Sequence, residues 1–84
     1  MPIRLIVLSV ETCIVPRLAL ARCLPQEGSP ARGSPLSTPA GATLSPVSCC
    51  EVSMPDGTRA LCLAFEDTAE VLALAPGDLL LGEG

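Results

Sequence analysis

The chain has 84 residues, of which 49% are hydrophobic, and its net charge is −4. This length allows one small domain at most, and the hydrophobic content excludes a fully disordered chain of low hydrophobicity. Phe65 is the only aromatic residue, so any core must be built mainly from Leu, Val, Ile and Ala.

The chain opens on a short apolar segment, residues 1–24. Residues 3–10 form an apolar run rich in Ile and Val, which favours a strand. Pro16 suits the first position of a short helix over residues 17–23. A transmembrane span is not predicted, because charges such as Glu11 interrupt the apolar run. A cleavable secretory signal and a mitochondrial presequence stay open as alternatives to the favoured cytoplasmic location.

A Pro/Ser/Gly-rich stretch follows at residues 25–46. It contains five Pro, four Ser and three Gly, a composition that predicts a disordered linker. Four of its Ser or Thr residues precede a proline and are therefore candidates for proline-directed phosphorylation: Ser29, Ser34, Thr38 and Ser45. Each phosphate would add a charge of about −1.5 to −2. Such dipeptides are common in any stretch of this composition, so a plain tether is the favoured interpretation.

The acidic C-terminal segment, residues 47–84, begins with a predicted β-hairpin. Residues 47–54 and 58–65 flank Pro55-Asp56-Gly57, in which Pro sets φ, Asp accepts a local hydrogen bond and Gly supplies a positive φ. A three-residue hairpin loop with Gly at the left-handed position is therefore expected.

The register of this hairpin determines which side chains face each other. If Met54 pairs with Thr58, then Cys50 lies opposite Cys62, and this register makes the two cysteines candidates for a disulfide. Neither face of the second strand is cleanly polar, so we expect that strand to be buried on both sides. After it, residues 67–70 resemble a capping box that starts a helix over residues 71–75, although a short strand is also allowed there.

Catalytic and metal-binding chemistry is not predicted. There is no His and no C-x-x-C pair among the five Cys, so the usual zinc spacings and any Ser-His or Cys-His pairing are missing. We therefore expect no catalytic, cofactor-binding or metal-ligating residue. The last 38 residues carry seven acidic residues against Arg59 alone, which disfavours nucleic-acid binding.

Residues 56–84 resemble the small β-barrel chaperones of nickel–iron hydrogenase maturation in their Asp-Gly turn, their Ala-Leu strand and their Pro-Gly-Asp-x-Leu-Leu segment. That resemblance implies a small β-barrel accessory factor. The functional cysteine of those chaperones directly follows the initiator Met, whereas Pro2 stands there in this chain, so no membership is assigned.

The sequence thus predicts a small, β-rich chain (β or α+β), part of it disordered, with segments 1–24, 25–46 and 47–84. Each flanking segment is shorter than the roughly 40 residues below which an isolated domain usually needs a disulfide, a metal or a partner. We therefore expect a non-enzymatic interaction polypeptide that orders on an unidentified protein partner. The alternatives are a small β-barrel accessory or chaperone-like factor, a targeted or secreted peptide with a cleavable N-terminus, and a chain without selected function.

Overall fold

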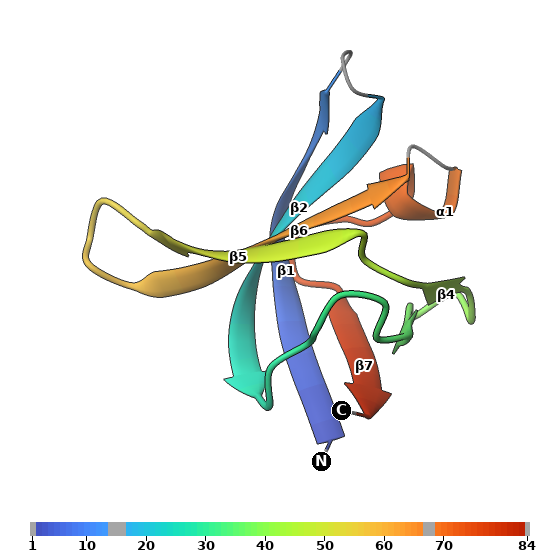
Figure 1. Cartoon of the computed structure of the whole chain (residues 1–84), viewed down its shortest axis with the longest axis horizontal. Coiled ribbons are helices and arrows are strands. Elements are labelled where there is room, and N and C mark those ends of the chain that lie inside the picture. The colour runs from blue at the N-terminus through green and yellow to red at the C-terminus, as the bar shows by residue number, and fades with distance from the viewer. Residues whose placement is uncertain (1, 14–16, 67–68, 84) are drawn as a thin grey trace.

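A computed structural model describes residues 2–13, 17–66 and 69–83 of the chain, and these fold around one antiparallel sheet (Figure 1). The sheet has seven strands in the order β4-β3-β7-β1-β2-β6-β5. The elements in chain order are β1 (Pro2–Cys13), β2 (Leu18–Glu27), β3 (Leu36–Ser37), β4 (Thr43–Leu44), β5 (Ser48–Ser53), β6 (Arg59–Glu66), α1 (Ala69–Leu72) and β7 (Leu79–Glu83). The expected small β-rich class is confirmed.

The N-terminal strand lies at the centre of the sheet. β1 pairs with β2 on one side and with β7, at the other end of the chain, on its second side. Ile3, Leu5 and Val7 alternate into the core, as the apolar run predicts for a strand. The register with β2 shifts between Val7 and Ser9, so the intervening Leu8 forms a bulge.

The helix expected over residues 17–23 is wrong, because residues 18–27 form strand β2. Ala and Leu have good helix propensities, but Ala19 and Ala21 alternate with Leu18 and Leu20 at the period of a strand. β2 hydrogen-bonds to β1 and β6 on its two sides, and this tertiary pairing outweighs the local preference. The predicted role of Pro16 lies outside the described residues.

The C-terminal hairpin has the predicted register. Val52 lies opposite Ala60 and Cys50 opposite Cys62. In the turn, the Met54 N–H donates to the Thr58 carbonyl oxygen at 2.8 Å, and Gly57 has a φ of 87°. The expected burial of β6 on both faces is also found, since the strand is buried at five of its eight positions.

Residues 25–46 differ from the predicted linker between separate segments. The first of them complete β2, and the rest include β3 and β4 at the edge of the sheet. Leu36, Leu44 and Pro46 are buried, and the Gly33 N–H donates to the Pro46 carbonyl oxygen at 2.9 Å. The Pro/Ser/Gly composition did not predict this attachment. A few widely spaced apolar residues are enough to attach an irregular segment to a core.

Two glycines allow this segment to approach the central strands closely. Gly28, where the chain leaves β2, has a φ of 67°, and a β-carbon there would collide with the Pro2 carbonyl oxygen. At Gly82 in β7, a β-carbon would lie 2.7 Å from the Pro35 carbonyl oxygen and 2.9 Å from Leu36 Cδ2. β3 can therefore pack beside β7 only because position 82 lacks a side chain.

The sheet is strongly curled. Its two edge strands, β4 and β5, are separated in the chain by residues 45–47 alone. A flat sheet of seven strands would hold its edges about 29 Å apart. The chain from Leu44 to Ser48 spans at most about 14 Å. The edges must therefore bend toward each other, and the concave side encloses the core.

The core is formed by the inward-facing side chains of the sheet, by Val71 in α1 and by Leu74 just after it. Phe65, at the end of β6, is the largest of its fully buried side chains. The helix expected over residues 71–75 is found earlier and shorter, as the four residues of α1 (Ala69–Leu72), while the proposed cap at Asp67 lies outside the described residues. The core comprises Ile3, Leu5, Val7, Ala19, Ala21, Cys23, Leu36, Leu44, Leu61, Leu63, Phe65, Val71, Leu74 and Leu80.

Candidate functional site

The convex face of the sheet carries a row of apolar side chains across five neighbouring strands. Ile6 in β1 lies opposite Leu79 in β7 and Leu24 in β2. Val52 in β5 lies opposite Ala60 in β6, and one further step of the β2–β6 register brings Ala60 beside Leu24. All five are excluded from the core cluster, whereas their chain neighbours Leu5, Cys23, Leu61 and Leu80 belong to it. We call these five residues the outer apolar row.

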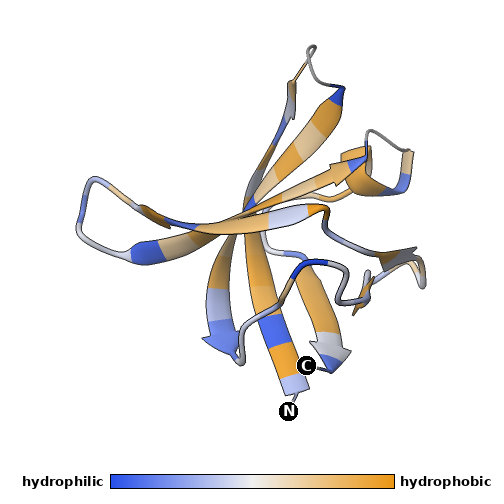
Figure 2. Ribbon diagram, in the orientation of Figure 1, coloured by the Kyte–Doolittle hydropathy of each residue, from blue (hydrophilic) through white to orange (hydrophobic). Residues whose placement is uncertain are grey.

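The outer apolar row is partly open to solvent. Ile6, Leu24, Val52 and Leu79 are half-buried, and the small Ala60 is buried between its larger neighbours. An antiparallel sheet with one solvated face normally alternates apolar and polar residues, so polar side chains would be expected at these positions. These positions are apolar instead, and Figure 2 shows that hydrophobic residues predominate in β1, β2, β6 and β7.

At β7 the row ends in a shallow hollow. Leu81, two residues after Leu79, lies on the same face and remains 47% exposed. The hollow has a volume of about 360 Å³ and an apolar floor. Its lining residues are Ser37, Thr38, Pro39, Gly77, Asp78, Leu79 and Leu81. A single apolar side chain of a partner would fit such a space.

A second, larger groove lies between the segment around β4 and the end of β6. It has a volume of about 770 Å³, with Phe65 and Val71 at its base. Its charged lining residues are Arg32, Glu66 and Glu70. All three charged side chains are exposed.

The four Ser/Thr-Pro sites are placed differently. Thr38 is buried, and its Oγ1 accepts a hydrogen bond from the Ala42 N–H at 3.1 Å. The half-buried Ser34 uses its Oγ to accept a hydrogen bond from the Ala31 N–H at 3.2 Å. Ser29 and Ser45 are exposed. If a kinase acts on the folded chain, Ser29 and Ser45 are the accessible candidates.

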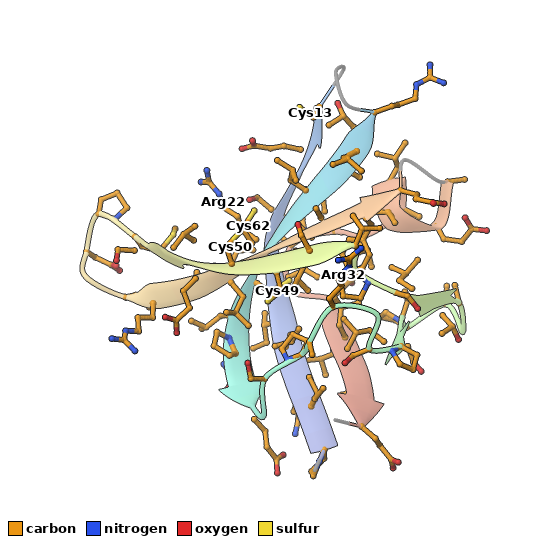
Figure 3. The ribbon with its side chains drawn as sticks, viewed as in Figure 1. Cys13, Arg22, Arg32, Cys49, Cys50 and Cys62 are labelled. Carbon is orange, nitrogen blue, oxygen red and sulfur yellow. The ribbon has the colours of Figure 1, made fainter. Side chains whose placement is uncertain are left out.

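Four of the five cysteines lie on three adjacent strands, split between the two faces of the sheet. Cys50 and Cys62 are on the convex face, and Cys49 lies on the other side of β5 (Figure 3). Cys23 is in the core, where burial, followed by the neighbouring thiols, raises its pKa to about 12. Burial likewise raises the pKa of Cys49 and of Cys62. Within residues 2–13, 17–66 and 69–83, no group of His, Cys, Asp and Glu is arranged to hold a metal ion.

The outer apolar row was not predicted from the sequence, although one signal for it was present. The lack of a clean polar face in β6 indicated that both of its sides contact apolar neighbours. The row exists because β6 pairs with β2 and β1 pairs with β7. The sequence of the hairpin predicts neither pairing.

No known protein family, curated protein or solved structure matches this chain. The resemblance of residues 56–84 to hydrogenase-maturation chaperones therefore remains a prediction. Among the described residues, no helix is long and apolar enough to cross a membrane.

Proposed function

We propose that this chain is a non-enzymatic protein-interaction domain that binds a partner protein through its outer apolar row. The observation that carries the proposal is the continuity of the row across five strands, with four of its five side chains left half-buried. Keeping apolar surface in contact with water costs free energy that burial against a partner recovers. Contiguous apolar patches of this kind are typical of interaction sites.

The charge of the chain indicates the chemistry of the partner. Five Arg stand against nine acidic residues, and the net charge is −4. Of the eight acidic residues in the described part of the chain, all but Asp78 are exposed. Complementary charge on two proteins steers their association and helps to select partners. The proposed partner is therefore a protein with an apolar strip and a positive net charge.

The core supports docking as an already folded domain. The sequence alone favoured a chain that orders on its partner, but 14 residues from both halves form one buried cluster. Residues 1–21 supply Ile3, Leu5, Val7, Ala19 and Ala21 to that cluster. Cleavage of a targeting peptide there would remove β1 from the centre of the sheet, so the proposal includes retention of the N-terminal segment. A small accessory domain of this kind is compatible with the same docking surface.

The test is a comparison of two substitutions at leucines of nearly equal exposure. Leu81→Gln changes the surface beside the outer apolar row, where Leu81 is 47% exposed. Leu72→Gln is the matched control, because Leu72 is 49% exposed but lies on α1. Proteins that co-purify with the wild-type chain are identified first, and the affinity of the main partner is then measured for both variants.

We expect Leu81→Gln to weaken binding about tenfold, the equivalent of about 1.4 kcal/mol. Leu72→Gln should bind like the wild type, and both variants should unfold at the wild-type urea concentration. Equal binding by all three proteins would contradict the proposal, and so would an equal loss of binding in the two variants.

A further inference from the structure

Cys50 and Cys62 form a directly opposed pair on the convex face of the β5–β6 hairpin. They are register partners, with their side chains on the same face of the sheet. Both thiols are free, Cys50 is exposed and Cys62 is half-buried. Arg22 in β2 is the register partner of Cys62 on its other side, so the three side chains form a row. Figure 3 shows Cys50, Cys62 and Arg22 gathered at one place.

We propose that Cys50 and Cys62 form a reversible cross-strand disulfide when the protein meets a small-molecule disulfide such as oxidised glutathione. The pairing makes this a specific modification site, because each thiol has the other as its nearest partner across the strand. Cys49 is not positioned to bond to Cys62, because successive residues of a strand point to opposite faces and Cys49 therefore points away from the convex face. The inference does not depend on the proposed docking function.

The position of Cys50 and Cys62 in the ladder allows a disulfide between them and indicates that this disulfide is easily reduced. The Met54 N–H donates to the Thr58 carbonyl oxygen, and hydrogen-bonded and non-hydrogen-bonded pairs alternate along an antiparallel ladder. Four residues further along each strand, Cys50 and Cys62 are again a hydrogen-bonded pair. The α-carbons of such a pair are about 5.5 Å apart, within the span of a disulfide. The β-carbons must approach by about 1 Å, and a strained, exposed disulfide is readily reduced.

The reaction proceeds by two exchange steps. The exposed Cys50, as a thiolate, attacks one sulfur of the small disulfide, whose S–S bond breaks and releases one thiolate. Cys62 then loses its proton and attacks the Cys50 sulfur, which forms the Cys50–Cys62 bond and releases the second small thiolate. The two protein thiols give up two electrons, which reduce the small disulfide, and their two protons end on the released thiols.

The surroundings of Cys62 control the second step. Burial, then the neighbouring Cys50 and, more weakly, Glu11 raise the pKa of Cys62, and the adjacent Arg22 opposes this rise. Because the thiolate is the attacking species, closure of the disulfide should become faster as the pH rises. Arg22→Gln should slow closure at neutral pH, since it removes the positive charge that favours the Cys62 thiolate.

The experiment uses the reduced, full-length protein. It is incubated with oxidised glutathione, its remaining thiols are alkylated, and it is then digested with trypsin. Cleavage after Arg32 and Arg59 produces fragments 33–59 and 60–84, which contain Cys50 and Cys62 respectively. We expect these fragments to remain joined, with the intact protein lighter by two hydrogen atoms, and reduced glutathione to reverse the link without denaturant.

Two variants identify the sulfurs involved. Fragment 33–59 also contains Cys49, so Cys49→Ser serves as the matched control and should retain the link. Cys50→Ser should abolish it. The proposal is overturned if Cys49→Ser loses the link, or if glutathione stays attached to Cys50 in the wild-type protein without closure. The wild-type peptide map decides the second point even if a variant fails to fold.

Discussion

The central strands and the segment between β2 and β5 are built in opposite ways. β1, β2 and β6 are eight to twelve residues long, and each is paired on both sides. Residues 28–46 contain only the two-residue strands β3 and β4. This segment is attached through isolated anchors such as Leu36 and Leu44. Continuous pairing stabilises the first region, whereas a few buried side chains position the second.

The composition of a segment describes its average and not the residues that attach it to the core. Residues 25–46 have the composition of a linker, yet Leu36 is completely buried and Thr38 is largely buried. Both regions pack against the core, so we expect them to differ mainly in the free energy of local opening.

The largest expected difference is in amide hydrogen exchange. The central residues of β1, β2 and β6 should exchange only through global unfolding, which costs about 5 kcal/mol or more in small domains. Amides of residues 28–46 should exchange through local opening and therefore much faster. The measurement is residue-resolved exchange of the isolated protein. Equally fast exchange in both regions would mean that the chain orders only on its partner.

Truncating a buried leucine should lower the free energy of unfolding more in the central strands than in the edge segment. Leu63, in β6, is completely buried. Leu63→Ala should lower the free energy of unfolding by about 2–5 kcal/mol, because it removes apolar contacts and leaves a cavity. Leu44→Ala should cost less, since the edge segment can detach locally. Urea unfolding of the two variants tests the difference, and equal losses would contradict it.

The attachment of the segment should depend on Gly82. Gly82→Ala places a methyl group against the Pro35 carbonyl oxygen and Leu36, so β3 must move away from β7. We expect a cost of about 1–3 kcal/mol for this overpacking. Limited trypsin digestion measures it, because Arg32 is an exposed cleavage site within the segment. Cleavage after Arg32 should accelerate about tenfold, in line with about 1.4 kcal/mol.

Cleavage after Arg59, in the hairpin, is the internal control for Gly82→Ala. Arg59 is exposed and lies at the other side of the sheet. Its cleavage rate should be unchanged. A parallel acceleration at Arg59 would show that the substitution unfolds the whole domain instead of releasing the segment.

The smallest expected effect is a pH dependence at the hairpin turn. The Thr58 N–H donates to Asp56 Oδ1 at 2.9 Å, and this hydrogen bond lowers the pKa of Asp56 from 3.8. A depressed carboxyl pKa stabilises the fold above the unfolded value, and this contribution is lost as the pH falls through the folded value. Asp56→Ala should therefore be less stable than the wild type at neutral pH and equal to it in strong acid. Unfolding midpoints of both proteins across this range provide the test.

The candidate sites differ in how far the sequence could predict them. The Cys50–Cys62 pairing followed from one turn, because Pro55-Asp56-Gly57 sets the hairpin register and the side-chain period of a strand is two. The outer apolar row could not be predicted in the same way. Its members come from five strands, and their alignment depends on pairings between residues that are up to 73 positions apart, such as Ile6 and Leu79.

Elements with local causes can be predicted from the amino-acid sequence alone. The apolar run of residues 3–10 specifies a strand through its β-branched residues, and the turn at residues 55–57 specifies a hairpin through its backbone preferences. The strand at residues 18–27 and the attachment of residues 25–46 to the sheet depend on tertiary contacts. In both cases the deciding contacts are long-range: hydrogen bonds to β1 and β6 for the first, and burial of a few anchors at the edge of the sheet for the second.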